Sequence, residues 1–93
     1  MAASLATLTA SAAFGEYPER PIEMIVAYSA GGGTDTAART LAPFIEKYLG
    51  NDASVVVVNK PGAGGEIGFT DLARADPDGY TIGFINTPNI LTI

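Results

Sequence analysis

Hydrophobic residues fall along the chain in short continuous runs separated by one clear helical repeat. Residues 22–28 and the four valines at 55–58 are such runs, which predict two strands of a parallel sheet, with the valine run as a buried central strand. A third strand is expected over 80–85. Between the first two strands, apolar residues recur every three or four positions up to residue 49. This spacing predicts a helix with one buried stripe.

The boundaries of the helices follow from capping residues. Thr34 or Asp35 is expected to cap the first helix, and Gly50 to end it just past the last turn. Pro43 predicts a kink or a local break inside that helix, because proline lacks the N–H of a helical hydrogen bond. A second helix is expected over 66–75, followed by a turn.

The resulting order is βαβαβ, which predicts an α/β fold with a parallel sheet, right-handed crossovers and strand order 2-1-3. Residues 86–89 are expected to form a loop after the third strand. Ligands of such sheets bind outside the carboxyl ends of the strands. Because three strands and two helices leave apolar edges uncovered, we expect the chain to be part of a larger fold.

Glycine-rich loops follow the first two strands, at 31–33 and at 62–65. A helix N-terminus after such a loop presents unpaired N–H groups and a positive dipole end, so an anion is the expected ligand, either phosphate or carboxylate. The alternative is that the glycines only form tight turns between strand and helix. Two glycine loops on one edge favour the binding role.

The residues expected to bind the ligand lie in these two loops and in the loop after the third strand. They are Ser29, Ala30, Gly31, Gly32, Gly33, Thr34, Asp35, Asn59, Gly62, Ala63, Gly64, Gly65, Asn86 and Thr87. At Asp35 a capping role and a ligand contact remain open. Lys60 is expected to be a solvated charge beside the site, Arg39 to face solvent or pair with an acidic neighbour, and Tyr28 to be a core or wall residue.

The composition excludes several kinds of catalytic site, metal site and partner. The chain has no Cys and no His, which removes thiol nucleophiles, imidazole bases and the usual zinc ligands. Its net charge is −5 and it has no basic run, which argues against a nucleic-acid partner. We therefore expect a binding protein and not an enzyme, with no catalytic residue, metal or cofactor.

A piece of a nucleotide-binding α/β enzyme is the alternative function. The dinucleotide pattern G-x-G-x-x-G fails at both loops, where Thr36 and Ile67 stand in place of the third glycine. The phosphate-binding motif that has a lysine directly after its last glycine is absent as well, because no lysine follows residues 31–33. Both observations argue against the nucleotide-binding alternative.

The first 14 residues are small, apolar and uncharged, and residues 10–12 fit the small-x-small pattern of a signal-peptidase site. The basic region that begins a secretory signal is missing, so a loose tail is the alternative. We expect two segments: a signal-peptide-like tail over 1–14, and the folded part over 15–93.

Several stretches together resemble the substrate-binding proteins of tripartite tricarboxylate transporters, the Bug family. These stretches are 17–22, 30–35, 38–39, 59–65, 67–68 and 75–81. Ala27 departs from the family, which commonly has proline there. The resemblance implies a periplasmic solute-binding protein with two α/β domains that close on a small organic carboxylate and deliver it to membrane transporter subunits. It also implies that 15–93 is the N-terminal part of domain one, without the second domain.

Overall fold

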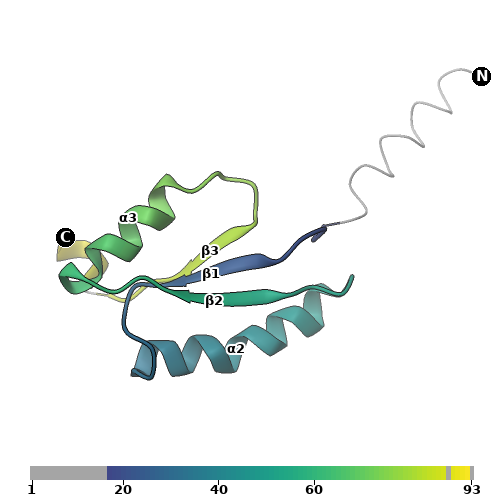
Figure 1. Ribbon diagram of the computed structural model, residues 1–93, viewed down its shortest axis with the longest axis horizontal. Coiled ribbons are helices and arrows are strands. Elements are labelled where there is room, and N and C mark those ends of the chain that lie inside the picture. Colours follow the sequence, from purple (N-terminus) through teal and green to yellow (C-terminus); the bar gives the residue numbers. More distant parts are fainter. Residues whose placement is uncertain (1–16, 88, 93) are drawn as a thin grey trace, which may run out of the picture.

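The computed structural model describes residues 17–87 and 89–92, so the predicted signal-like segment lies outside the described residues. Three parallel strands form one sheet: β1 (Ile22–Val26), β2 (Val55–Asn59) and β3 (Thr81–Phe84). Their order is β2-β1-β3, with β1 paired to both neighbours (Figure 1). The α/β class and the predicted order 2-1-3 are confirmed.

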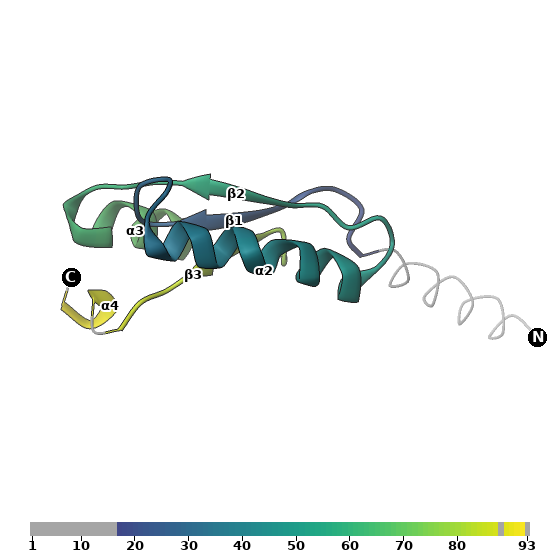
Figure 2. The same ribbon diagram turned by 90° about the horizontal axis from the view of Figure 1, so that it is seen from below.

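Helices cover the two faces of this sheet. The long helix α2 (Gly33–Leu49) lies on one face, and α3 (Glu66–Arg74) lies on the other, as Figures 1 and 2 show. A 3-10 turn, η1 (Ala63–Gly65), leads into α3. A short helix, α4 (Asn89–Thr92), follows β3, so the prediction that the loop extends through residue 89 was wrong.

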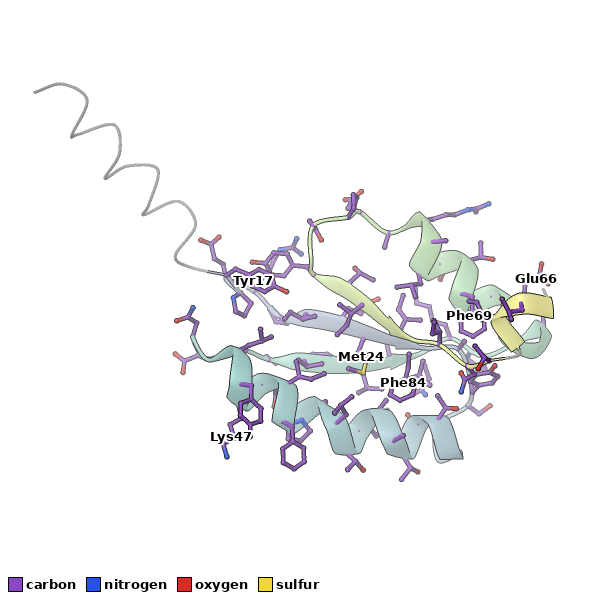
Figure 3. The ribbon with its side chains drawn as sticks, turned by 180° about the vertical axis from the view of Figure 1, so that it is seen from behind. Tyr17, Met24, Lys47, Glu66, Phe69 and Phe84 are labelled. Carbon is purple, nitrogen blue, oxygen red and sulfur yellow. The ribbon has the colours of Figure 1, made fainter. Side chains whose placement is uncertain are left out.

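The core lies between β1 and α2. Ile22, Met24 and Val26 point to the same side of β1 and are buried together with Ala38 and Ala42 of α2. Figure 3 shows Met24 and Phe84 between the sheet and α2, and Phe69 on the opposite side, on α3. Four of the five residues of β1 are buried, as expected of a parallel strand that is covered on both faces.

The opposite face of β1 packs closely against α3. A Cβ at Gly68 of α3 would lie 2.6 Å from Cα of Ala27 and 2.9 Å from the carbonyl oxygen of Lys60. Only glycine allows this approach of a helix to a strand. The glycine therefore sets how closely α3, and the loop before it, lies to the end of β1.

Three predictions about the strands and helices need correction. The valine strand is not central: β2 lies at an edge of the described sheet, and Val56 is 48% exposed. A β-branched run indicates a strand, but not which strands flank it.

Neither Thr34 nor Asp35 caps α2, because the N-cap is Gly32, without a side-chain cap bond. The helix continues without a break through Pro43, which lies on its exposed side, whereas Gly50 ends it as predicted.

Candidate functional site

The carboxyl ends of the three parallel strands meet at one edge of the sheet, where α2 and η1 also begin (Figure 1). The structure thus brings the two glycine loops and the loop after β3 to the same edge, as the strand order predicts. Ser29, Ala30 and Thr87 are exposed there.

The first glycine loop leaves the first N–H groups of α2 without helical partners. Gly31 has φ of 89° and donates its N–H to Oδ2 of Asp35 at 2.9 Å. The first bond of the helix runs from the Thr36 N–H to the Gly32 carbonyl at 2.9 Å. The N–H groups of Gly33, Thr34 and Asp35 therefore stand before the first helical bond, at the positive end of the helix dipole.

The second loop has an unusual backbone. Gly62, Ala63, Gly64 and Gly65 all have positive φ, between 51° and 128°. The Gly65 N–H donates to the Gly62 carbonyl at 3.1 Å, which closes the 3-10 turn. The N–H groups of Ala63 and Gly64 take no part in the loop bonds that the structure describes. This loop is the second set of main-chain donors on the same edge.

A network of side chains connects the two loops. Asn59, at the end of β2, donates from Nδ2 to the Tyr28 carbonyl at 3.0 Å and to Oδ1 of Asp35 at 2.9 Å. Its Oδ1 accepts a bond from Arg39 at 3.0 Å, and the Nε of Arg39 donates to both carboxylate oxygens of Asp35. The network therefore joins the ends of β1 and β2 to the first turn of α2.

Asp35 is the charged centre of this network, and it is 3% exposed. The Gly31 N–H, followed by the Asn59 amide and Arg39, holds the pKa of Asp35 below its ordinary value of 3.8. Its carboxylate thus accepts hydrogen bonds from the protein. The role of Asp35 seen in the structure is to fix the first glycine loop.

The third loop is tied to the first through Asn86, whose Nδ2 donates to Oγ1 of Thr34 at 3.1 Å. The other amide atom, Oδ1 of Asn86, is buried without a partner among the described residues, as is the hydroxyl of Tyr28. Gly65 lies next to Tyr28: a Cβ there would lie 3.0 Å from the hydroxyl. Tyr28 is half-buried against Phe69, which agrees with the predicted role of core or wall residue.

The two basic residues near the site are paired. Arg39 pairs with Asp35, as expected, but its bond to Asn59 was not foreseen, because residues 20 apart in sequence carry no local signal of contact. Lys60 was expected to be a solvated charge and instead bonds Asp71 at 2.8 Å. The hydrogen bond to Asp71 raises the pKa of Lys60. An anion at this edge would therefore be bound mainly by main-chain N–H groups.

Two features are absent from the part of the chain that the structure describes. No cluster of acidic, His or Cys side chains suited to a metal ion occurs among residues 17–87 and 89–92. Within the same ranges, no helix has the length and apolar character needed to cross a bilayer.

Comparison with known proteins gives consistent matches. The model of the tripartite tricarboxylate transporter family receptor matches residues 37–92. The protein BugT of Bordetella pertussis is 50% identical over 66 residues, which are 71% of this chain and 20% of BugT. A protein of Cupriavidus necator, described as the UPF0065 protein in the gbd 5′ region, is 41% identical over 87 residues, covering 94% of this chain and 26% of that protein.

Solved structures agree with the sequence matches. The periplasmic binding protein BugD is 57% identical with a TM-score of 0.68, over 72% of this chain and 22% of BugD. MatC from Rhodopseudomonas palustris, solved with bound malate, is 37% identical with a TM-score of 0.67, over the same shares. The chain thus spans about a quarter or less of the length of these relatives.

Proposed function

Because the chain belongs to the family of tripartite tricarboxylate transporter receptors, we propose that it binds a small organic carboxylate as part of a periplasmic solute-binding protein. The bound acid would be handed to the membrane subunits of a tripartite tricarboxylate-type transporter. Receptors of this family bind solutes and are not enzymes, which confirms the class predicted from the sequence.

One observation carries the proposal: two sets of main-chain N–H groups lie at the same edge of the sheet. The groups of Gly33 and Thr34 stand at the start of α2, and those of Ala63 and Gly64 belong to the second loop. A carboxylate has two oxygens that can each accept such bonds, and the helix dipole favours its charge. The malate bound to MatC is a ligand of this chemical class.

Periplasmic location is part of the proposal. BugD is described as a periplasmic binding protein, and a second solved structure, 46% identical to this chain, as a periplasmic transporter. The segment 1–14 remains a hypothesis for a secretory signal, because it lies outside the described residues.

The alternative, a nucleotide-binding enzyme, is less compatible with the geometry at the end of β2. In dinucleotide-binding sheets an acidic residue at this place accepts bonds from the ribose hydroxyls. Here Asn59 occupies the place, and its amide is already bonded to Tyr28, Asp35 and Arg39. Its Oδ1 already accepts a bond from Arg39, and a neutral amide lacks the charge and the second acceptor oxygen of the carboxylate that binds a ribose.

A chimera supplies the test. Residues 17–92 of this chain would replace the matching region of MatC, and malate, NAD and ATP would be titrated calorimetrically. We expect malate to bind and neither nucleotide to do so. Tight binding of a nucleotide, with none of malate, would overturn the proposal.

Gly33→Val in the chimera tests the role of the first loop. No atom lies within 4 Å of a Cβ at Gly33, and its φ is not positive, so the fold tolerates the side chain. The added bulk would stand where the carboxylate approaches the N–H groups, so malate affinity should fall by tenfold or more, roughly 1.4 kcal/mol. The matched control is Ala37→Val, on an exposed position one turn further along α2. Equal affinities in both variants would mean that the glycines only form turns.

A further inference from the structure

The outer edge of β2 forms one side of the described sheet (Figure 2). The Ile22 N–H of β1 donates to the Ser54 carbonyl at 2.8 Å, and Ile22 lies beside Val55 in the register of the two strands. Main-chain groups of alternate residues point to opposite sides of a strand, so those of residues 55, 57 and 59 face outward, away from β1. Among residues 17–87 and 89–92, no strand pairs with this outer edge.

The middle of this outer edge is open to pairing. Val57 directs its N–H and carbonyl outward, without a partner in the described part of the chain. Val56 is 48% exposed, and β2 contains neither a charged residue nor a proline. Proteins usually protect an exposed strand edge with such residues, and an edge that lacks them is a template for another strand. One outward group is occupied, the Val55 N–H, which donates to the Glu46 carboxylate at 2.8 Å.

Opposite charges of α2 stand at the two ends of the edge. Arg39 donates to the Asn59 side chain at 3.0 Å, at the carboxyl end of β2, and Glu46 accepts from Val55 at the amino end. Pro43 lies between these two charges on the same side of α2 and is exposed. A groove of about 400 Å³ between the helix and the strand is lined by Arg39, Ala42, Pro43, Glu46, Val55, Val56 and Val57.

This edge is complementary to a second copy of itself. In an antiparallel pair centred on Val57, residue 55 of one copy lies opposite residue 59 of the other. Glu46 of each copy then stands beside Arg39 of the other copy, at both ends of the edge. On the opposite face of the sheet, Val56 lies opposite Val58, so an apolar side chain meets an apolar side chain. Such self-complementarity is what a two-fold interface requires.

We propose that the outer edge of β2 is the interface between two copies of this chain, whose sheets join across a two-fold axis at Val57. Two main-chain bonds link Val57 of one copy to Val57 of the other. The Glu46 carboxylate has two oxygens, so it can accept bonds both from the Val55 N–H and from Arg39 of the second copy. A parallel arrangement would place like charges side by side, which disfavours it. The interface does not depend on what the glycine loops bind.

Disulfide cross-linking tests the register, because the 93-residue chain has no Cys of its own. Equal amounts of the variants Val56→Cys and Val58→Cys would be mixed and oxidised. In the proposed pairing these two positions lie opposite each other, with Cα atoms about 4.5 Å apart, within reach of a disulfide. Two copies of the same variant would hold their thiols on the diagonal, roughly 7–8 Å apart and too far for a disulfide. We expect the mixed disulfide to exceed the two like disulfides together by about fivefold or more, whereas random collision gives equal amounts.

Sedimentation equilibrium of the same chain measures the dimer, and Glu46→Arg tests the charge pairs. This variant would set two guanidinium groups side by side at both ends of the interface, so the dissociation constant should rise by about tenfold or more. Glu46→Gln keeps an acceptor for the Val55 N–H and should have a smaller effect. The matched control is Asp76→Arg, which makes the same charge change at an exposed position in the turn before β3, and should leave the dissociation constant within about twofold. Far-UV circular dichroism would show that each variant keeps its helix content.

Each of three results would overturn the proposal. A chain that stays monomeric from micromolar to millimolar concentration would mean that Glu46 protects the edge from pairing. Like disulfides as abundant as the mixed one would mean that the two strands do not pair in this register. A dimer that Glu46→Arg weakens no more than Asp76→Arg does would place the contact on another face of the molecule.

Discussion

Replacing Asn59 with alanine should destabilise the edge of the sheet that holds the two glycine loops. The amide makes three hydrogen bonds, at 3.0 Å to the Tyr28 carbonyl, 2.9 Å to Asp35 and 3.0 Å to Arg39. A hydrogen bond contributes roughly 1 kcal/mol net, so the substitution should cost about 3 kcal/mol of the free energy of unfolding. That is a large part of the ~3–5 kcal/mol that a core of this size provides.

Urea denaturation followed by circular dichroism measures this cost. The control is Asn51→Gly, which removes an exposed amide that donates to the Tyr17 carbonyl at 3.0 Å, far from the network. Asn51 has φ of 53°, and glycine keeps this conformation without strain. We expect the control to cost under about 1 kcal/mol, as one exposed hydrogen bond.

Asn59→Asp gives an independent readout, even if the alanine variant does not fold. At neutral pH it would place a second carboxylate 2.9 Å from an oxygen of Asp35, and a carboxylate has no hydrogen to donate to Tyr28. We expect this variant to gain stability relative to the parent as the pH falls and the new carboxyl protonates. Two results together would refute the stabilising role of the Asn59 network. The free energy of unfolding of the alanine variant would lie within about 0.5 kcal/mol of the parent, and the stability of the aspartate variant would depend on pH as that of the parent does.

Three further outcomes are expected, each checked by denaturation of the purified chain. Gly68→Ala should strongly lower stability, because its Cβ would lie 2.6 Å from Cα of Ala27. The pKa of Asp35 is lowered from 3.8, so its contribution is present above pH 3.8 and is lost as the pH falls through the folded value; Asp35→Asn should flatten this acid loss in a pH series. The pKa of Lys60 is raised from 10.5, so the stability gained from its pairing with Asp71 is fully present below pH 10.5 and is lost as the pH rises through the folded pKa. Lys60→Met should therefore leave the dependence of stability on pH near neutrality unchanged.

The strand order and the common edge of the loops could be predicted because they follow from local patterns. Short apolar runs and a helical repeat give the βαβαβ order, and right-handed connections then leave few sheet arrangements. The two glycine loops lie at the edge where this argument places them. The position of the valine strand at an edge could not be predicted, because a run of β-branched residues has the same pattern at an edge as at the centre.

The side-chain connections of the site depend on distant parts of the chain, and this is why most were missed. The pairing of Arg39 with Asp35 follows from helical spacing, but its bond to Asn59 depends on where β2 ends relative to α2. The bond of Lys60 to Asp71 likewise depends on how α3 crosses the sheet. A strand sequence carries no signal of such contacts.

At the start of α2, the sequence pattern could not show whether Asp35 caps the helix or bonds to other groups. Thr34 and Asp35 are both good capping residues, yet the helix begins before them, at Gly33. The Asp35 carboxylate accepts a bond from the Gly31 N–H instead, with Asn59 and Arg39 as further partners. The Asp35 carboxylate is thus engaged by these partners, and the N–H groups of Gly33 and Thr34 stand before the first helical bond.

Carboxylate binding by the main chain of the two glycine loops is the central claim, and amide chemical shifts test it most directly. The ¹⁵N-labelled chain would be titrated with malate into the millimolar range, where weak binding by a single loop edge is still detected, and with NAD and ATP in parallel. The account predicts saturable shifts with one common dissociation constant at the amides of Gly33, Thr34, Ala63 and Gly64. Shifts of these amides with a nucleotide, or a malate response confined to other parts of the chain, would contradict it.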